Sequence, residues 1–559
     1  MKRLFLVLIM FRMLLLVVMA CGGSLRADSD AYRALSENLY ANGVFGCGEI
    51  PTAYRPPLYP MLLLPAVAVE RLTGSPAASD TVIAILHTLW STVTIAGTWW
   101  LAERIVRPRS DSGPPNAVAR WVPPIAAMLV TIDPILIRQA GLVMTETVAT
   151  GLAVLLLLAG NPIRRKGDGG SDSGGGAGKG YMRAALTGTL YGLAVLCRPA
   201  FLPMAILATL LFAGAAVVAM RGGTINDTTS GIPGTRWRMV AVWGCFVAAM
   251  LTPISVWTAR NVMDFGTPII TTTHGGYTLL LGNNADYDAW LRSDRRQPWD
   301  AENFQRELAR EFSTTGGIPV GMPDPTGLRE RLMADRSGHS FENLAKNAAD
   351  DRGNGDLHSC SVDEVEMDRA MRRQAIATMR ADPAAMGRAT AARITRFWGV
   401  MPMASENESA LHRAVRYGIA VFYTIVGGLT LIGVGVGIFH SIAAIRRRDG
   451  CSLSPWRRID SRIVLCTAIV LKTAAIHSIY WTDMRMRSVI VPVLAIIAAH
   501  GFTAILKLCG TLRSISGRKS DANSSDQDYE SHLDHGFKSE HFERCEKARA
   551  VISNRFGRE

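Results

Sequence analysis

Long apolar runs alternate with polar segments rich in arginine along most of this chain. A helix needs about 20 residues to cross a bilayer, and ten runs approach or reach that length. They cover residues 4–20, 81–101, 121–137, 142–159, 184–196, 201–220, 239–257, 417–439, 463–480 and 488–506. The run 58–69 is too short to span, and we expect it at the membrane interface. The pattern therefore predicts an all-α integral membrane protein, a polytopic bundle of about ten transmembrane helices.

Composition supports the same class of protein. Hydrophobic residues make up 48% of the 559 residues and the mean hydropathy is +0.17, yet the formal net charge is +13. A soluble protein seldom combines these values, because its charged surface dilutes the apolar fraction. The excess positive charge indicates membrane topology and contact with anionic lipids, and we expect no nucleic-acid partner.

The basic clusters fall on one side of the membrane if the spans alternate. Cytoplasmic loops carry the excess of lysine and arginine, so this side is predicted to be the cytoplasm, with both termini in it. The basic clusters lie at 2–3, 104–109, 164–166, 221–238, 446–448 and 507–518. The loops that then face outward are 21–80, 138–141, 197–200, 258–416 and 481–487.

Four regions follow from this topology. An N-terminal transmembrane catalytic module, 1–260, includes the first outward loop, 21–80. An extracytoplasmic loop domain, 261–415, contains stretches with helical spacing at 365–379 and 384–398. The C-terminal transmembrane helices occupy 416–508, and 509–559 is a polar cytoplasmic tail predicted to be disordered. The glycine-rich segment 167–180 is a flexible linker by its composition.

The N-terminus and the cysteines have competing interpretations. The apolar segment up to Ala20, followed by Cys21, is also typical of a signal peptide or a lipoprotein cleavage site, but nine further spans argue against a lipoprotein. The nine cysteines form no CxxC pair, so no zinc or disulfide framework is predicted. Cys47 and Cys360 both face outward, where a disulfide is chemically possible, although their spacing does not favour one.

The first outward loop carries the strongest candidate chemistry. Asp28 and Asp30 follow the first span, and an acid at a bilayer surface is a functional candidate because its desolvation is costly. Asp is also a preferred helix cap, and we expect one of the two to cap a helix beginning near Ala31. Arg55 precedes two prolines, which fix the backbone and would hold its guanidinium for a phosphate. The alternative is a plain turn with a solvated arginine.

Further charged residues lie at the outer ends of later spans. Glu146 lies just inside an apolar run, where it either has a function or pairs with Arg138 or Arg198. Arg260 either contacts a phosphate or anchors its span at the interface. Arg485 lies in the segment 483–487 before the last span. The pair Asp133-Pro134 is a weaker candidate that marks a helix end.

The order and shared sidedness of these motifs resemble the GT-C glycosyltransferases, membrane enzymes that take sugars from polyprenyl-phosphate carriers. The likeness is greatest to the family 39 branch, with protein O-mannosyltransferases and the lipid A aminoarabinose transferase. In this family an acid of the first loop is the catalytic base, and the acids before Tyr32 match that pattern. Asp28 lies four positions before Tyr32, a spacing that the family often shows. Met486 departs from the pattern, because relatives carry an aromatic residue there. The resemblance covers residues 1–290 and the last span.

This resemblance implies an inverting transfer of a monosaccharide from a polyprenyl-phosphate donor to a hydroxyl acceptor. The reaction would take place on the outer face of the plasma (inner) membrane, with a lipid, a polysaccharide or a protein as acceptor. The implied catalytic residues are Asp28 or Asp30 as general base, and Glu146. The implied substrate-binding residues are Tyr32, Arg55, Arg198, Arg260 and Arg485. No cofactor is certain, and the family leaves a divalent cation open, with its ligands unassigned.

Two alternatives stay open. A polytopic transporter or flippase also places acids and arginines at discontinuous helices, although no pair of related halves is visible here. An oligosaccharyltransferase would use a diphosphate-linked glycan, but the outward domain lacks a WWDxG-like motif.

Overall fold

The computed structural model describes residues 2–28, 30–106, 118–160, 176–221, 234–293, 364–404, 408–446 and 461–509, together with 299, 301, 303–305 and 308. The predicted tail beyond residue 509, most of the predicted linker and Cys360 lie outside these residues. The chain divides into two compact units, Met1–Phe502 and Thr503–Glu559. The structure described below belongs to the first unit, apart from the last turns of its final helix.

Helices account for nearly all regular structure in the described residues. The α-helices are α1 (Lys2–Cys21), α2 (Tyr32–Asn42), α3 (Leu58–Thr73), α4 (Pro76–Val106), α5 (Val122–Ile132), α6 (Pro134–Ala140), α7 (Glu146–Ala159), α8 (Gly176–Cys197), α9 (Leu202–Arg221), α10 (Gly234–Phe265), α11 (Gly275–Gly282), α12 (Ala285–Arg292), α16 (Glu364–Ala381), α17 (Pro383–Trp398), α18 (Ala410–Arg446) and α19 (Ser461–Ile479). The short 3-10 helices are η1 (Ser24–Arg26), η2 (Ala119–Trp121), η3 (Pro199–Phe201) and η6 (Met484–Ile490). The strands β1 (Gly46–Cys47) and β2 (Ile50–Pro51) pair as an antiparallel hairpin.

All ten predicted apolar runs lie on helices. Within the described ranges, five helical segments are long and apolar enough to cross a membrane by themselves. They are Pro76–Val106, Pro199–Val218, Trp237–Phe265, Ala410–Phe439 and Met484–Cys509. The count of ten spans stays a prediction, since several of the other helices are shorter or less apolar. The helix α8 begins at Gly176, so it is longer than the apolar run 184–196 and takes in the end of the predicted linker.

The predicted single span 121–137 is wrong in one respect, because the chain breaks it into α5 and α6. The two helices are bent by 53° and would form a sixth span if counted together. Asp133 has an extended backbone at the break, and its Oδ1 accepts the N–H of Leu136 at 3.0 Å. Pro134 then begins α6, as proline favours a first helical turn. The prediction that Asp133-Pro134 marks a helix end is confirmed.

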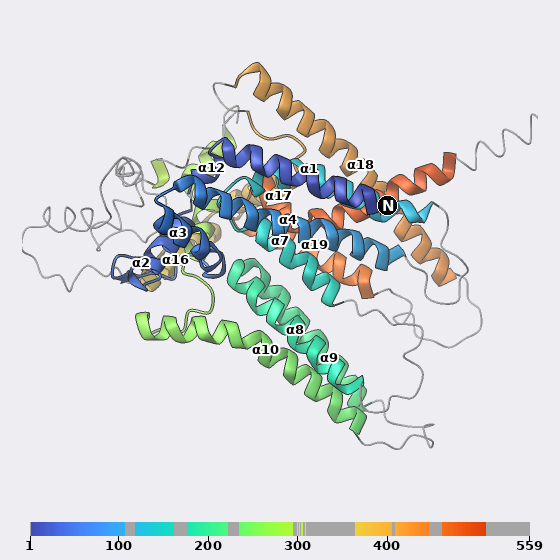
Figure 1. Cartoon of the computed structure of the whole chain (residues 1–559), viewed down its shortest axis with the longest axis horizontal. Helices are drawn as coiled ribbons and strands as arrows, with labels where there is room; N and C mark the ends of the chain where they lie inside the picture. Colours follow the sequence, from blue (N-terminus) through green and yellow to red (C-terminus); the bar gives the residue numbers. More distant parts are fainter. Residues whose placement is uncertain are drawn as a thin grey trace, which may run out of the picture. The chain divides into compact units, whose positions relative to one another are not determined.

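The helices pack through close backbone contacts and a shared apolar core. Figure 1 shows α8 lying along α10. Gly188 and Gly192 permit this approach, because a Cβ at either would collide with the backbone of Phe246 or Met250 on α10. The main core joins α3, α4, α7, α8 and η6, and buries residues such as Leu152 at 1% exposure.

The region 261–415, here called the outward region after its predicted position, contains the helices that the sequence predicted at 365–379 and 384–398, which are α16 and α17. A second core packs α11 and α16 against Tyr54 of the first loop. Figure 1 shows α2, α3 and α16 gathered at the same end of α1 and α4. The first loop and the outward region therefore meet at one place, where the candidate site lies.

Candidate active site

The backbone turns sharply before α2 and orients the carboxylate of Asp28. Ala31 has a left-handed conformation with φ 58°, and Oδ2 of Asp28 accepts the N–H of Ala34 at 3.0 Å. The N-cap position is Ala31, and the carboxylate of Asp28, three residues before it, accepts this N–H of the first turn in the way that a cap would. Its Oδ1 is buried and has no hydrogen-bond partner among the described residues. Burial raises the pKa of Asp28, although the N–H of Ala34 and the charge of Arg33 oppose that shift.

Asp30 makes an ion pair with Arg55. Nη2 of Arg55 donates to Oδ1 of Asp30 at 3.0 Å, and its guanidinium carbon lies 5.6 Å from the ring centroid of Tyr32. Nη1 lies 3.4 Å from Nε2 of His274. Burial alone would lower the pKa of Arg55, but the charge of Asp30 and the neighbouring tyrosines together outweigh burial, and the pKa is raised. Arg55 is therefore a permanent cation with a fixed orientation.

Tyr32 is held by a chain of buried polar groups. Its ring meets that of Tyr59 edge to face at 5.3 Å. The hydroxyl of Tyr59 lies 2.8 Å from Nε2 of His87, and Nδ1 of His87 lies 2.7 Å from the carbonyl oxygen of Ala140. Since a carbonyl only accepts, Nδ1 carries the proton and Nε2 accepts from Tyr59. This chain fixes α3, α4 and α6 relative to Tyr32.

Glu146 begins α7 and pairs with Arg198. Its Oε1 lies 3.3 Å from Nη1 of Arg198, and the residue is only 2% exposed. Nη2 of Arg198 donates to the thioether sulfur of Met486 at 3.1 Å. Of the two partners considered from the sequence, Arg198 is therefore the one that Glu146 contacts. Oε2 of Glu146 is buried without a hydrogen-bond partner among the described residues.

Arg485 approaches the same place from η6. Its Nε lies 3.1 Å from Oδ2 of Asp483, and its Nη1 donates to the sulfur of Met144 at 3.4 Å. The charges of Glu146 and Asp30 both act on Arg485. Met486 contacts Arg198 from the same short helix.

Six of the predicted residues therefore converge, and we call them the outer cluster. Burial raises the pKa of Tyr32, and the charges of Arg55, Asp30, Glu146 and Arg198 act on its hydroxyl. These residues and Arg485 lie at or just before the first turns of five different helices, α2, α3, α7, η3 and η6. The outer cluster consists of Asp30, Tyr32, Arg55, Glu146, Arg198 and Arg485.

Asp28 lies next to the outer cluster. The charges of Asp28 and Glu146 both act on the hydroxyl of Tyr59, and the ring of Tyr59 contacts that of Tyr32. Asp28 therefore has an unpaired oxygen close to Tyr59, which contacts Tyr32 of the outer cluster. This arrangement suits a group that accepts a proton near a negatively charged leaving group.

Arg260 lies apart from the outer cluster. Its Nη1 and Nη2 donate to the carbonyl oxygens of Thr52 and Phe45 at 2.9 and 2.8 Å. Its Nε lies 2.7 Å from Oδ2 of Asp264, and its guanidinium lies over the ring of Trp257. The structure thus places Arg260 where it holds the hairpin of the first loop, and it does not bring this residue to the other arginines.

Two residues that the sequence did not single out, Glu364 and His274, complete the surroundings of Arg55. Glu364, at the start of α16, accepts the hydroxyl of Thr52 at 2.8 Å and the N–H of Ala53 at 3.1 Å. It also accepts the hydroxyl of Thr273, the residue before His274. Burial raises the pKa of Glu364, although these hydrogen bonds oppose the shift. No motif marks either residue, because each acts through partners distant in the sequence.

The acids of the outer cluster do not offer a free ligand set for a divalent cation. Asp30 is paired with Arg55, and Glu146 with Arg198. Across the described part of the chain, no group of three or more His, Cys, Asp or Glu residues is placed to hold a metal ion. A divalent cation, which prefers several oxygen ligands, would have to compete with Arg55 and Arg198 for these two carboxylates.

No family model matches the chain, and no curated protein sequence matches it. Its fold is similar to that of an archaeal oligosaccharyltransferase, AglB from Archaeoglobus fulgidus, in complex with an inhibitory peptide and a dolichol-phosphate. The TM-score is 0.43 at 12% identity, over 99% of this chain and 55% of that one. The apo oligosaccharyltransferase of the same organism gives 0.44 at 14%, over 92% and 52%.

A third similar structure is ArnT from Cupriavidus metallidurans bound to undecaprenyl phosphate, with a TM-score of 0.30 at 11% identity, over 88% of this chain and 77% of that one. The chain spans about half the length of the two oligosaccharyltransferase structures. At these scores and identities, similarity alone assigns neither the fold nor the activity.

Proposed function

We propose that this protein is an inverting glycosyltransferase of the membrane. It transfers a monosaccharide from a polyprenyl-phosphate donor to a hydroxyl acceptor at the outer face. The observation that carries the proposal is the outer cluster, in which three arginines and two carboxylates meet at the ends of apolar helices beside Asp28. The sequence resemblance to GT-C enzymes rests on the same residues.

The arginines stabilise the phosphate that departs. A phosphate ester that loses its sugar gains negative charge on the leaving oxygen, and fixed cations stabilise this charge most effectively where water is excluded. Arg55 and Arg198 are oriented by their carboxylate partners at 3.0 and 3.3 Å. The charges of Asp30 and Glu146 both act on Arg485. Guanidinium groups suit this task, because they are always charged and match phosphate geometry.

Asp28 acts as the general base. It takes the proton of the acceptor hydroxyl through Oδ1 while Oδ2 stays bonded to Ala34. The acceptor oxygen forms a bond to the anomeric carbon on the face opposite the phosphate, and the bond from that carbon to the phosphate oxygen breaks. Its electron pair leaves with the phosphate, and the configuration inverts. Asp30 is less suited to this role, since its Oδ1 is committed to Arg55.

Glu146 orients the sugar. Its buried Oε2 is available to accept a hydrogen bond from a sugar hydroxyl, while Oε1 stays with Arg198. A hydroxyl donor would satisfy an acceptor whose burial without a partner is otherwise costly. Tyr32 provides an aromatic surface beside it.

The lipid carrier places the reaction at the membrane. We propose an integral protein of the plasma (inner) membrane, with both termini in the cytoplasm and the outer cluster on the outer face. A dolichol-phosphate and undecaprenyl phosphate, bound in two of the similar structures, belong to the carrier class proposed here. The acceptor is a lipid, a polysaccharide or a protein.

A panel of labelled donors tests the reaction class. Membranes that contain the protein are incubated with polyprenyl-phosphate mannose, glucose and arabinose, and with a diphosphate-linked oligosaccharide. Label moving from a monophosphate donor supports the proposal and identifies the sugar. Label moving only from the diphosphate donor would replace it with an oligosaccharyltransferase. Uptake of donor by vesicles that lack any acceptor, without transfer, would replace it with a transporter.

A further inference from the structure

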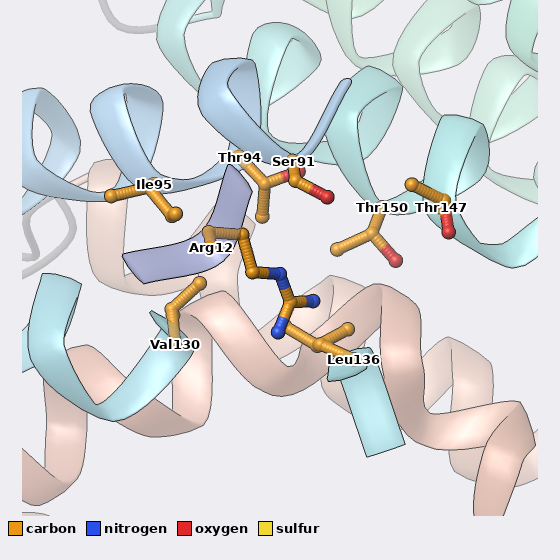
Figure 2. Close-up of a pocket in the computed structure, with 8 residues that line it drawn as sticks. All are labelled: Arg12, Ser91, Thr94, Ile95, Val130, Leu136, Thr147 and Thr150. Carbon is orange, nitrogen blue, oxygen red and sulfur yellow. The ribbon is translucent and has the colours of Figure 1, made fainter. Parts of the chain in front are cut away.

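A polar cavity lies among the apolar helices, beside the first turn of α7 that begins with Glu146. Figure 2 shows Arg12 of α1 extending toward α6, with hydroxyl-bearing side chains of α4 and α7 on the other side. The residues that line the cavity are Arg12, Ser91, Thr94, Ile95, Val130, Leu136, Thr147 and Thr150. It has room for about one water molecule or an ion of similar size.

Arg12 lies in the middle of the first apolar helix and is 4% exposed. Its one hydrogen bond within the described structure runs from Nη1 to the carbonyl oxygen of Thr131, at 3.1 Å. The charge of Asp133 acts on Arg12, but it also acts on Arg487. The single negative charge of Asp133 is therefore shared between two guanidinium groups. A charge at this depth is costly unless it is balanced.

The rest of the polar lining donates hydrogen bonds and carries no negative charge. The hydroxyls of Ser91 and Thr147 are buried and have no partner among the described residues. Those of Thr94 and Thr150 donate to carbonyl oxygens of their own helices. Two buried hydroxyl donors and a guanidinium thus face one small space. Unpaired buried donors of this kind call for an acceptor.

We propose that this cavity binds a small monovalent anion of the chloride class. The anion supplies the negative charge that Arg12 lacks and accepts hydrogen bonds from Ser91 and Thr147. A water molecule would accept from these donors too, but it would leave the charge of Arg12 unbalanced. The site would fasten α1 to α4 and α7, one helical turn from Glu146. This inference does not depend on the proposed transfer reaction.

Thermal unfolding of the detergent-purified protein tests the site. The ionic strength is held constant while chloride replaces gluconate, an anion too large for the cavity. A ligand that binds the folded state raises Tm with its concentration, and we expect a rise of about 1–3 °C at a chloride concentration tenfold above Kd. Bromide should reproduce the effect, and its anomalous scattering should appear beside Arg12 in crystals.

Three variants make the test specific. Arg12→Met should abolish the response of Tm to chloride, and the double variant S91A/T147V, which keeps the charge and nearly the same volume, should reduce it. Arg183→Met, an exposed arginine on α8, is the matched control and should keep the full response. If Arg12→Met does not fold, the double variant decides. Equal Tm values in chloride and gluconate, or an unchanged response in the double variant, would overturn the proposal.

Discussion

The guanidinium of Arg55 lies 3.0 Å from the carboxylate of Asp30, and this pair links two parts of the first loop that are 25 residues apart in the sequence. Arg55 is also placed by its neighbours, because Glu364 and Thr273 fix the segment before it and His274 lies beside it. The pair is therefore the point at which the outward region contacts the outer cluster. Its geometry decides where a departing phosphate would lie.

Arg55→Ala should lower kcat for transfer by about 10²–10³-fold, the usual effect of removing one fixed group that stabilises developing negative charge. Asp30→Asn should have a smaller effect, because it loosens the guanidinium without removing it. Steady-state kinetics on both variants measures the difference. Arg183→Ala, exposed on α8, serves as the control. A larger loss for Asp30→Asn than for Asp28→Asn would move the role of base to Asp30.

Asp28→Asn should leave the protein as stable as the natural chain near neutral pH, or more stable. Burial raises the pKa of Asp28, so the folded state binds its proton more tightly than the unfolded chain does. The free energy of unfolding therefore falls as pH rises from the ordinary carboxylate range through the raised pKa. Asparagine can still accept the N–H of Ala34 but cannot ionise. Melting curves between pH 4 and 8 should show a weaker loss of Tm with rising pH in the variant.

Glu364→Ala should destabilise the protein by about 1–3 kcal/mol for each buried donor that it leaves unpaired. These donors are the hydroxyls of Thr52 and Thr273 and the N–H of Ala53. Thermal unfolding in detergent provides the measurement. The control is Glu366→Ala on the same helix, whose side chain is 53% exposed and whose ion pairs contribute little. Equal Tm values for the two variants would contradict the role given to Glu364.

Gly433→Val should weaken the packing of α18 against the last apolar segment, Met484–Cys509. A Cβ at Gly433 would collide with the carbonyl of Ile497, whereas one at Gly435 would meet nothing within 4 Å. Forcing extra atoms into a packed contact costs about 1–3 kcal/mol, so Gly433→Val should lower Tm and Gly435→Val should not. The comparison tests this helix crossing directly, and no loss in Gly433→Val would show that the two helices do not approach as described.

The helices were predictable because apolar runs and helix-ending residues are local signals. Each of the ten predicted apolar runs lies on helix, and Asp133-Pro134 marked the break between α5 and α6. Clustering of Asp30, Arg55 and Glu146 was predictable in outline, since the topology puts them on one face. The environments of individual arginines were not, because contacts distant in sequence decide them. Arg260 donates hydrogen bonds to the first-loop hairpin. Arg12 lines a cavity, although it lies in a run whose sequence predicts an ordinary apolar helix.

The most direct test of the central claim is transfer from radiolabelled polyprenyl-phosphate sugars in membranes that contain the natural chain or Asp28→Asn at equal amounts. If Asp28 is the general base, label passes to an acceptor with the natural chain and transfer is lost in the variant, while both proteins are inserted and fold. Transfer by Asp28→Asn at the natural rate would contradict Asp28 as the base. Absence of transfer from every monophosphate donor by the natural chain would contradict the proposed reaction itself.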